Sequence, residues 1–486
     1  MRPLPQVSLS AAAAAAVGSE IRGDDTVALR DVAFDSRDVA PGALFFCVRG
    51  ATVDGHRFGE EAVGAGAAAL VVERWLELDV PQVRVRSVRD AMGPMSAAVF
   101  SEPSRSLTVV GVTGTNGKTT VVHLLDAIFR GAGCRTGAIG TVGAHVDGEP
   151  VAFPRTTPEA PDLQRVLARM RDAGVTGVAM EVSSHALDLG RVAGVHLDAA
   201  VFTNLSHDHL DHHGTMESYF AAKASLFAPE RAAHAVVNLD DPWGRRLLDV
   251  PLPLTTYGRD AAADVRAEDV RPTPVGLSFR LGDRDVTSSL RGAFNVSNCL
   301  AALAAAGVVG IAEDDAIRGL AGAGHVPGRM EPVDAGQRFL VVVDYAHTPD
   351  SIRTVLAAAR PLATGRVIVV FGCGGDRDRA KRSPMGAAAT EGADLTVITT
   401  DNPRSEDPEA IIAEVERGAA TGGGRYVVEP DRRAAIRLAL AEARPGDVVV
   451  VAGRGHEQAQ ELADRSLPFD DRAVVRQELE AIGGAT

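Results

Sequence analysis

Short apolar runs that end in clusters of polar residues recur along most of the chain. They cover residues 107–112, 177–180, 199–202, 235–237, 340–343, 367–371, 395–399 and 448–451. Runs of this length are typical of buried strands, and the stretches between them carry apolar residues at helical spacing, as in residues 432–443. Because strands alternate with helices, the pattern predicts an α/β fold with mostly parallel sheets, whose ligands bind beyond the carboxyl ends of the strands.

Domain boundaries follow from the same pattern. The 486 residues are too many for one ordinary hydrophobic core, and the length alone favours two to four domains. Short strands at residues 31–34 and 44–48 belong to a first segment, which ends before Pro103. Residues 326–331 contain a Pro-Gly pair and form a second predicted connection. We therefore expect domains at residues 1–102, 103–331 and 332–486.

The composition is that of a soluble globular chain, with 45% hydrophobic and 23% charged residues. The formal net charge of −14 argues against a general nucleic-acid binder, which would normally carry a basic face. No apolar stretch is long enough to span a membrane, and the first residues lack the pattern of a secretory signal. We expect a cytoplasmic protein with no nucleic-acid partner and no membrane span.

Four cysteines are scattered along the chain without the paired spacing of a zinc site. They are Cys47, Cys134, Cys299 and Cys373. In a cytoplasmic chain this distribution favours reduced thiols over a disulfide framework.

A glycine-rich loop follows the predicted strand at residues 107–112. It reads GTNGKTT from Gly114 to Thr120, and apolar residues at helical spacing come directly after it. Backbone N–H groups of such a loop and the positive end of the next helix bind phosphate, Lys118 adds a charge, and Thr119 can offer its hydroxyl to Mg²⁺. Val112 stands where the general pattern has glycine, so a structural turn remains the alternative. The loop predicts a nucleotide triphosphate site.

Other strand ends carry candidate metal and nucleotide ligands. Glu181 ends a predicted buried strand, where a phosphate-bound cation would satisfy its carboxylate; capping of a neighbouring helix is the alternative. Residues 207–213 interleave histidines with carboxylates, which suits Mg²⁺ beside phosphates better than tetrahedral zinc. Asn295 lies in a polar turn that enters an alanine-rich helix, and it could be a cap and nothing more.

Loops after different strands of the third domain carry Arg377 and Arg404. An arginine and an aspartate in one loop often form only a surface ion pair. Two guanidinium groups that face a common pocket, however, suit the bidentate capture of carboxylates. These loops therefore indicate a site for a ligand that carries carboxylate groups.

Several motifs together resemble the Mur ligases of bacterial cell-wall synthesis, over essentially the whole chain. They are the glycine loop, residues 181–185 (EVSSH), residues 204–211 (NLSHDHLD) with Gly214, Lys223, and residues 344–349 (DYAHTP). The resemblance implies an N-terminal domain that binds a UDP group, a central ATPase domain and a Rossmann-like C-terminal domain that binds an amino acid. It also implies ATP and Mg²⁺ as cofactors, and we expect a monomer.

The resemblance is strongest to the members that add the third residue of the peptide. It implies an ATP-dependent ligase that joins meso-diaminopimelate to UDP-N-acetylmuramoyl-L-alanyl-D-glutamate through an acyl phosphate, in peptidoglycan precursor synthesis. In the family, an Asp-Asn-Pro-Arg sequence goes with meso-diaminopimelate rather than lysine, and residues 401–404 carry it in full. The chain departs from the family pattern at Arg155, Leu189 and Arg454.

The same resemblance implies the site residues. Those for ATP are Gly114, Thr115, Asn116, Gly117, Lys118, Thr119, Thr120, Asn295 and Asp344. Those for the UDP-linked substrate are Ser36, Ala51, Thr52, Val53, Thr156, Thr157, Ser183 and Arg191. Those for diaminopimelate are Arg377, Asp401, Asn402, Pro403, Arg404, Gly453 and Glu457. The catalytic residues are Lys118, Glu181, His209 and Lys223, and the metal ligands are Thr119, Glu181, His209 and a carbamylated Lys223.

Lys223 has a second interpretation. It lies in residues 219–227, which look like an amphipathic helix, and a lysine there is usually a surface residue whose ammonium group reaches water. The carbamylated form is implied by the resemblance alone.

Two other functions stay open at this point. A folylpolyglutamate synthetase shares the glycine loop and the amide chemistry, although residues 401–404 and the N-terminal domain argue against it. A non-catalytic nucleotide switch or a P-loop motor would explain the glycine loop. Either would leave Arg377, Arg404 and Glu457 without a role.

Overall fold

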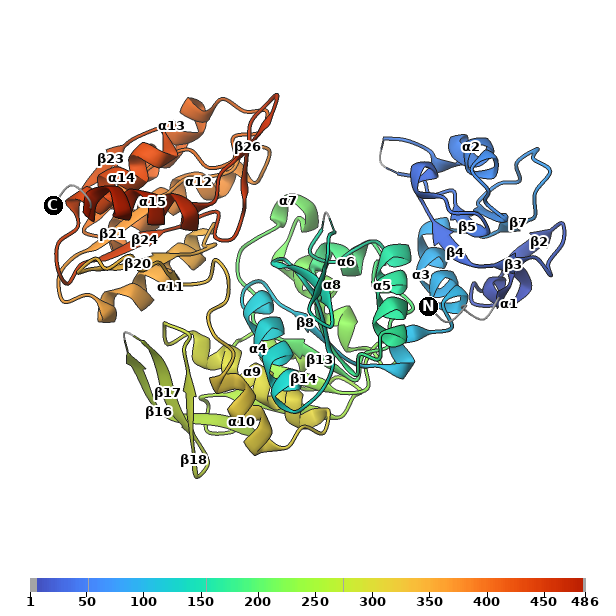
Figure 1. Cartoon of the computed structure of the whole chain (residues 1–486), viewed down its shortest axis with the longest axis horizontal. Coiled ribbons are helices and arrows are strands. Elements are labelled where there is room, and N and C mark those ends of the chain that lie inside the picture. The colour runs from blue at the N-terminus through green and yellow to red at the C-terminus, as the bar shows by residue number, and fades with distance from the viewer. Residues whose placement is uncertain (1–6, 51, 154, 274, 484–486) are drawn as a thin grey trace.

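The computed structural model describes residues 7–50, 52–153, 155–273 and 275–483, which form three α/β units. Each unit is built on one large sheet, of five, eleven and six strands in chain order. The N-terminal and C-terminal units lie at opposite ends of the middle unit (Figure 1). The α/β class with mostly parallel sheets is thereby confirmed. Among the described residues, no helix combines the length and the apolar character that crossing a bilayer requires.

The N-terminal unit has parallel strands β4 to β7 with β2 antiparallel at one edge. In spatial order they are β2 (Glu20–Arg22), β7 (Gln82–Arg84), β6 (Ala69–Val72), β5 (Ala43–Phe46) and β4 (Asp31–Ala33). The helices are α1 (Leu9–Ala13), α2 (Gly59–Gly64) and α3 (Val88–Val99), and the short strands β1 (Val7–Ser8) and β3 (Ala28–Leu29) pair separately. All residues of β5 and β6 are buried, because apolar cores lie on both faces of the sheet.

The middle unit carries the longest sheet. Its strands are β11 (Glu149–Val151), β10 (Gly143–Val146), β9 (Thr136–Gly140), β12 (Gly177–Glu181), β8 (Thr108–Thr113), β13 (Ala199–Phe202), β14 (Ala235–Asn238), β15 (Leu254–Gly258), β16 (Val265–Thr273), β17 (Gly276–Leu281) and β18 (Arg284–Ser288). The strands from β9 to β16 run parallel, and antiparallel ribbons close both edges.

Helices cover both faces of this sheet, which is why its central strands are buried on both faces and mostly apolar rather than alternating. One core contains side chains of α4 (Lys118–Gly131), α9 (Asn295–Val308) and α10 (Glu313–Ala321). The core on the other face contains side chains of α5 (Ala160–Asp172) and α8 (Met216–Ala224). The short helices α6 (Ser184–Asp188) and α7 (Leu210–His213) follow β12 and β13.

The strand register places the predicted loops at one edge of the sheet. Glu181 pairs with Val112, and Phe202 pairs with Thr113, so β8, β12 and β13 end at the same level. The glycine loop leaves β8 at this edge, and α4 begins at Lys118 after a left-handed Gly117 with φ of 90°. The expected strand, loop and helix are confirmed.

The C-terminal unit has a parallel sheet with one antiparallel edge strand. Its strands are β19 (Glu331–Pro332), β20 (Leu340–Val343), β24 (Val448–Val451), β21 (Val367–Phe371), β22 (Leu395–Ile398) and β23 (Tyr426–Val428). Its helices are α11 (Pro349–Ala359), α12 (Arg382–Gly392), α13 (Pro408–Ala419), α14 (Arg432–Glu442) and α15 (Asp471–Gly483). A separate hairpin joins β25 (Ala459–Glu461) to β26 (Ser466–Pro468).

Candidate active site

A cavity of about 630 Å³ lies where the middle and C-terminal units meet. The middle unit contributes the glycine loop and the ends of several parallel strands. The C-terminal unit contributes the end of β20 and the start of α11. Its lining includes Thr115 to Thr120, Thr141, Thr156, Glu181, Ser183, Asp208, His209, Asn298, Arg329, Asp344, Tyr345 and His347.

The glycine loop is closed around its own lysine. Lys118 Nζ donates to the carbonyl oxygens of Gly114 and Thr115, at 2.9 and 2.8 Å. Burial is the main cause of a lowered pKa for Lys118. The loop approaches the end of β13 so closely that a Cβ on Gly114 would lie 1.8 Å from Thr203 Oγ1. A glycine is therefore required at residue 114, where φ is +146°.

Lys223 is buried, with 1% of its surface exposed, so the interpretation as a surface lysine is wrong. Its Nζ donates to the Gly114 carbonyl oxygen at 2.8 Å and lies 4.6 Å from the centre of the Tyr219 ring. Burial, followed by the charge of Lys118, holds the pKa of Lys223 well below its usual value. The residue stands in α8, whose inner face packs against the glycine loop.

Glu181 accepts two hydrogen bonds from Thr141, the residue directly after β9. The Thr141 N–H reaches Oε1 at 2.7 Å and its hydroxyl reaches Oε2 at 3.1 Å. These donors lie at a strand end, so the alternative that Glu181 caps a neighbouring helix is wrong. The Thr141 hydroxyl is also 3.1 Å from that of Thr156, a predicted substrate residue.

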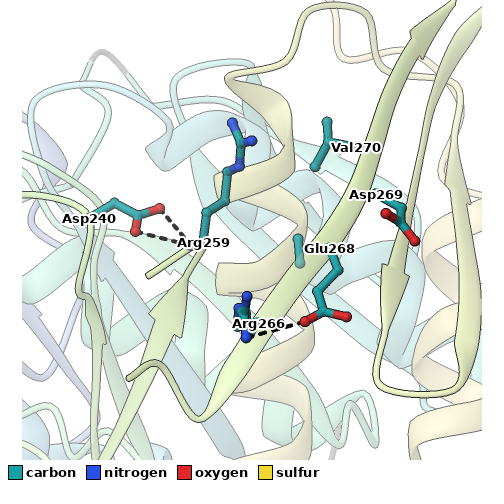
Figure 2. A pocket seen from close by; sticks show the side chains of 7 residues that line it. Asp240, Arg259, Arg266, Glu268, Asp269 and Val270 are labelled. Carbon is teal, nitrogen blue, oxygen red and sulfur yellow. Dashed lines mark hydrogen bonds and ion pairs between the residues drawn. The ribbon is translucent and has the colours of Figure 1, made fainter. Parts of the chain in front are cut away.

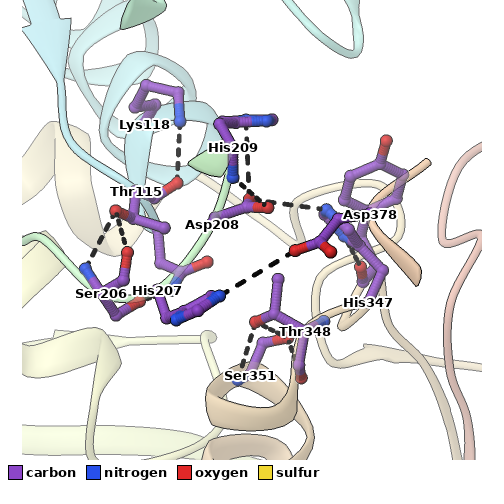
Figure 3. A network of polar contacts seen from close by, with 12 residues as sticks. Thr115, Lys118, Ser206, His207, Asp208, His209, His347, Thr348, Ser351 and Asp378 are labelled. Atoms are coloured by element: carbon purple, nitrogen blue, oxygen red, sulfur yellow. Dashed lines mark hydrogen bonds and ion pairs between the residues drawn. The ribbon is translucent and has the colours of Figure 1, made fainter. Parts of the chain in front are cut away.

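A polar network crosses from the middle unit to the C-terminal unit (Figure 3). Asp208 Oδ2 lies 3.5 Å from Nε2 of His209 and 4.0 Å from Nε2 of His347. His207 faces Asp378 of the C-terminal unit at 3.9 Å. Burial lowers the pKa of both His209 and His347 to about 4. His209 has a left-handed φ of 54°, a conformation that costs free energy and is concentrated at functional sites.

Arg329 is a site residue that the sequence analysis missed. It comes from the connection before β19, its Nη2 donates to Thr119 Oγ1 at 3.1 Å, and its guanidinium lies 4.5 Å from the centre of the Tyr345 ring. In the sequence, Arg329 is marked only by its position directly after a Pro-Gly turn. Such a turn indicates a connection between domains but does not show where the arginine side chain points. The contact brings a second cation beside the predicted triphosphate site.

Of the two predicted nucleotide ligands Asp344 and Asn295, only Asp344 lines the cavity. Asp344 lines the cavity and accepts hydrogen bonds from the N–H groups of Met330 and Ala346, both at 2.8 Å, and burial raises its pKa. Asn295 is buried behind the lining, where its Oδ1 accepts from Asn298 Nδ2 at 2.7 Å. Asn298, which was not among the predicted ligands, is the one that faces the cavity.

Four of the predicted amino-acid-binding residues gather between two loops of the C-terminal unit. Asn402 Nδ2 donates to Glu457 Oε2 at 2.7 Å, and a Cβ on Gly453 would lie 2.6 Å from Asp401 Oδ2. Burial, followed by the charge of Asp401, raises the pKa of Glu457. Pro403 lies between Asn402 and Arg404, and its carbonyl oxygen would lie 1.9 Å from a Cβ on Gly375.

The two predicted arginines differ in their surroundings. Arg404, with a left-handed φ of 51°, contacts Glu461 through Nε at 2.7 Å and donates to the Gly375 carbonyl oxygen at 2.8 Å. Arg377 is exposed. Both pass close to Gly374, where an added Cβ would lie 3.1 Å from Arg404 Nη1 and 3.8 Å from Arg377 Cγ. Neither lines the interdomain cavity.

The residues predicted for the UDP-linked substrate fall into two groups. Thr156 and Ser183 line the cavity, Thr157 donates to the Glu181 carbonyl oxygen at 2.9 Å, and Arg191 contacts Glu159 at 3.0 Å. The second group belongs to the N-terminal unit and does not line this cavity: Ser36, Thr52 and Val53. Ala51 lies outside the described residues.

A second hollow lies beside β15 and β16 and is lined by residues of the middle unit alone (Figure 2). Asp240 accepts hydrogen bonds from the backbone N–H of Arg259, and Arg266 pairs with Glu268 at 3.2 Å. None of the predicted site residues lines this hollow. The interdomain cavity is therefore the candidate active site.

The fold and the cavity first define a class: a multidomain α/β enzyme with a glycine-rich strand–loop–helix element at a domain interface. Three family models match successive parts of the chain. They are the Mur ligase family catalytic domain at residues 29–100, the Mur ligase middle domain at residues 112–306 and the Mur ligase glutamate ligase domain at residues 328–455. The chain belongs to the Mur ligase family, and it is a ligase.

Individual relatives agree with this assignment. A UDP-N-acetylmuramoyl-L-alanyl-D-glutamate--2,6-diaminopimelate ligase of Geobacillus thermodenitrificans is 49% identical over 93% of this chain and 94% of its own length. A solved structure of a protein with the same description has a TM-score of 0.70 and 34% identity, over 98% and 99% of the two chains.

The folylpolyglutamate synthase of Mycobacterium tuberculosis shares the fold, with a TM-score of 0.60 and 21% identity over 74% of this chain and 91% of that one. The non-catalytic switch and the motor do not agree with membership of a ligase family.

Proposed function

We propose that this chain joins meso-diaminopimelate to the D-glutamyl side chain of UDP-N-acetylmuramoyl-L-alanyl-D-glutamate with ATP as the energy source. The observation that carries the proposal is the interdomain cavity, which combines Lys118 and Glu181 of the middle unit with groups of the C-terminal unit. The relatives that are 44–49% identical to this chain carry the name of this activity. An activated carboxyl group and an incoming amine would meet between the two units.

The reaction has two steps. The glutamyl carboxylate attacks the γ-phosphorus of ATP, the bond from the γ-phosphorus to the bridging oxygen breaks, and ADP leaves with the bonding electrons. The diaminopimelate amine then attacks the acyl carbon, phosphate leaves from the tetrahedral intermediate, and the nitrogen loses a proton. Both reactants of the first step are anions, so charge neutralisation and alignment supply most of the catalysis.

Several side chains neutralise this charge. Lys118 would leave the carbonyl oxygens of its own loop and contact the β and γ phosphates. Arg329, 3.1 Å from Thr119 Oγ1, would add a second positive charge from the interdomain connection. Asp344 would hold the nucleotide from the C-terminal unit. Closure of the two units would exclude water, which otherwise hydrolyses an acyl phosphate.

The donor set fits Mg²⁺. Thr119 offers a hydroxyl oxygen, and the buried Glu181 carboxylate offers oxygens whose protein partners are the two donors of Thr141. The described residues contain no group of three or more His, Cys, Asp or Glu that could hold a metal by itself. This fits a cation that keeps water and binds substrate phosphates. When bound, it would screen the phosphate charge, with His209 and a carbamylated Lys223 at a second position.

Carbamylation of Lys223 has a physical basis in its surroundings. Only the unprotonated amine reacts with CO₂, to give a carbamate and a proton, and burial beside Lys118 favours that neutral form. The product replaces a buried cation by an anion. Two lysines that repel each other would become an ion pair.

The C-terminal loops support diaminopimelate over lysine. Diaminopimelate carries an additional carboxylate and ammonium at its far end. Arg377 and Arg404 would bind the carboxylate, while Asp401, Asn402, Glu457 and the backbone at Pro403 and Gly453 would surround the rest. A site that leaves such groups unpaired with the wrong substrate discriminates strongly.

The test is phosphate release by the purified protein with ATP, Mg²⁺ and the UDP-linked dipeptide. We expect release to depend on meso-diaminopimelate, to be much slower with lysine, and to accompany a UDP-linked tripeptide identified by mass spectrometry. Release that ignores both the dipeptide and the amino acid, with no such tripeptide, would contradict the proposal.

A further inference from the structure

One hydrogen bond joins the C-terminal unit to the strand end that holds Glu181. His456 Nε2, in the loop after β24, lies 3.0 Å from the carbonyl oxygen of Thr141. A carbonyl oxygen only accepts, so the ring donates through Nε2 and Nδ1 keeps its lone pair. Burial, followed by the charge of Arg329, lowers the pKa of His456 to about 4, which agrees with a neutral ring.

Thr141 is the point at which three parts of the site meet. Its N–H and hydroxyl hold the Glu181 carboxylate, and its hydroxyl lies 3.1 Å from Thr156 Oγ1. Its carbonyl oxygen accepts from His456 Nε2. The hydrogen bond therefore reports the position of the C-terminal loop relative to the groups around the reacting carboxyl.

The loop that carries His456 is closely held within its own unit. A Cβ on Gly328 would lie 2.3 Å from His456 N, so the interdomain connection and this loop touch through their backbones. The neighbouring residue Glu457 accepts from Asn402 Nδ2 at 2.7 Å. The loop is thus fixed to the predicted amino-acid pocket on one side, and it reaches the middle unit through the ring of His456.

We infer that His456 is a positioning residue for the second step, the attack of the amine on the acyl phosphate. Its Nε2–H bond to Thr141 sets the distance between the amino-acid pocket and the activated carboxyl group. The first step uses Lys118, Arg329 and Glu181, and the side-chain hydrogen bonds of all three go to other groups than His456. Lys118 donates to Gly114 and Thr115, Arg329 donates to Thr119, and Glu181 accepts from Thr141. This inference rests on the proposed function.

The test compares two amide variants with two nucleophiles. In H456Q the side-chain amide nitrogen can reach the place of Nε2, whereas in H456N it reaches only the place of Nδ1. Hydroxylamine attacks an acyl phosphate without needing the amino-acid pocket and gives a hydroxamate and phosphate. Phosphate release in the presence of hydroxylamine therefore reports the first step, and it is measured in parallel with the diaminopimelate reaction.

We expect H456N to lower kcat with diaminopimelate by about tenfold or more, because a positioning hydrogen bond is lost. Its hydroxylamine-dependent phosphate release should stay within about twofold of wild type, and H456Q should recover most of the diaminopimelate rate. Thermal unfolding midpoints show that the variants are folded. If H456N does not fold, H456M takes its place, because it fills the space without a donor.

Three results would overturn the inference. H456N could match wild type with diaminopimelate, both nucleophiles could lose rate equally, or H456Q could be as slow as H456N. A failure of the proposed function looks different: wild type itself would release phosphate with hydroxylamine but not with diaminopimelate, and the inference would fall with it.

Discussion

Lys118 and Lys223 donate to the same acceptor, the carbonyl oxygen of Gly114, at 2.9 and 2.8 Å. Both ammonium groups are buried, and burial is the main cause of the lowered pKa of each. Lys118 also donates to the Thr115 carbonyl oxygen, but no carboxylate pairs with either ammonium group among the described residues, and carbonyl oxygens alone compensate buried positive charge poorly. The pair therefore supports the proposal that negative charge enters here, from phosphates at Lys118 and from a carbamate at Lys223.

The carbamate can be detected directly. With ¹³C-bicarbonate we expect wild-type protein to show a carbamate signal in carbon NMR that disappears on acidification. K223A should lack the signal and lose about a hundredfold or more in ligase activity, because the second metal position loses its carboxylate. A K223A protein with wild-type activity would contradict the assignment.

Lys118 should be required for the first step. K118A removes the charge that contacts the β and γ phosphates, and we expect phosphate release to fall by about a thousandfold. K118R keeps the charge but not the compact ammonium, and it should remain severely impaired. The measurement is hydroxylamine-dependent phosphate release. Normal turnover by K118A would refute the role of the glycine loop.

Arg404 should determine the choice of amino acid. R404M removes the guanidinium, and we expect the preference for diaminopimelate over lysine in kcat/KM to fall by about a hundredfold. E461Q serves as the matched control, because it removes the carboxylate that contacts Arg404 and leaves the arginine free for substrate. An unchanged preference in R404M would show that other groups select the amino acid.

Protonation of buried histidines should destabilise the protein in acid. Burial lowers the pKa of His347 and His456 to about 4 from a usual value near 6.5. Between these values the unfolded chain binds protons that the folded chain does not, so stability falls as pH falls from about 6.5 to about 4. The unfolding midpoint should drop across this range, and less steeply in H347Q. Equal slopes for the two proteins would contradict the assignment.

The ion pair between Arg432 and Asp471 should hold the C-terminal helix. Both side chains are 0% exposed, and two hydrogen bonds of 2.8 and 2.6 Å join them. D471N leaves the arginine charge buried without its partner and should cost about 3–5 kcal/mol of unfolding free energy. The solvent-screened pairs of Glu268 with Arg266 and Arg280 are the control, where E268Q should change the unfolding free energy far less than D471N does. Denaturant unfolding measures both.

Local sequence patterns were enough to predict individual strands and helices. Four apolar residues in succession predicted β13 at Ala199–Phe202 and β24 at Val448–Val451 with the bounds that the structure has. The glycine loop predicted a helix directly after it, and α4 begins three residues earlier than the apolar spacing at residue 121 indicated, at Lys118. These features depend on side-chain periodicity and on backbone geometry over a few residues, and both are determined by residues that are close together in the sequence.

Local patterns do not show which isolated polar residues are buried. Residues 219–227 look like an amphipathic helix, in which a lysine is usually a surface residue, yet Lys223 is buried. Asn298 and Asn295 lie on the same turn of α9, and only packing shows that Asn298 faces the cavity. Which residues of a helix face a site depends on how the helix is oriented against the sheet, and tertiary packing determines that orientation.

The sequence by itself determined the α/β class, the strand ends that carry polar groups and the chemistry of the glycine loop. Only the tertiary structure decided which distant groups meet: Arg329 contacts Thr119 across 210 residues, and His456 contacts Thr141 across 315. The physical reason is that such contacts depend on the packing of whole units, whose relative position no local spacing of residues encodes.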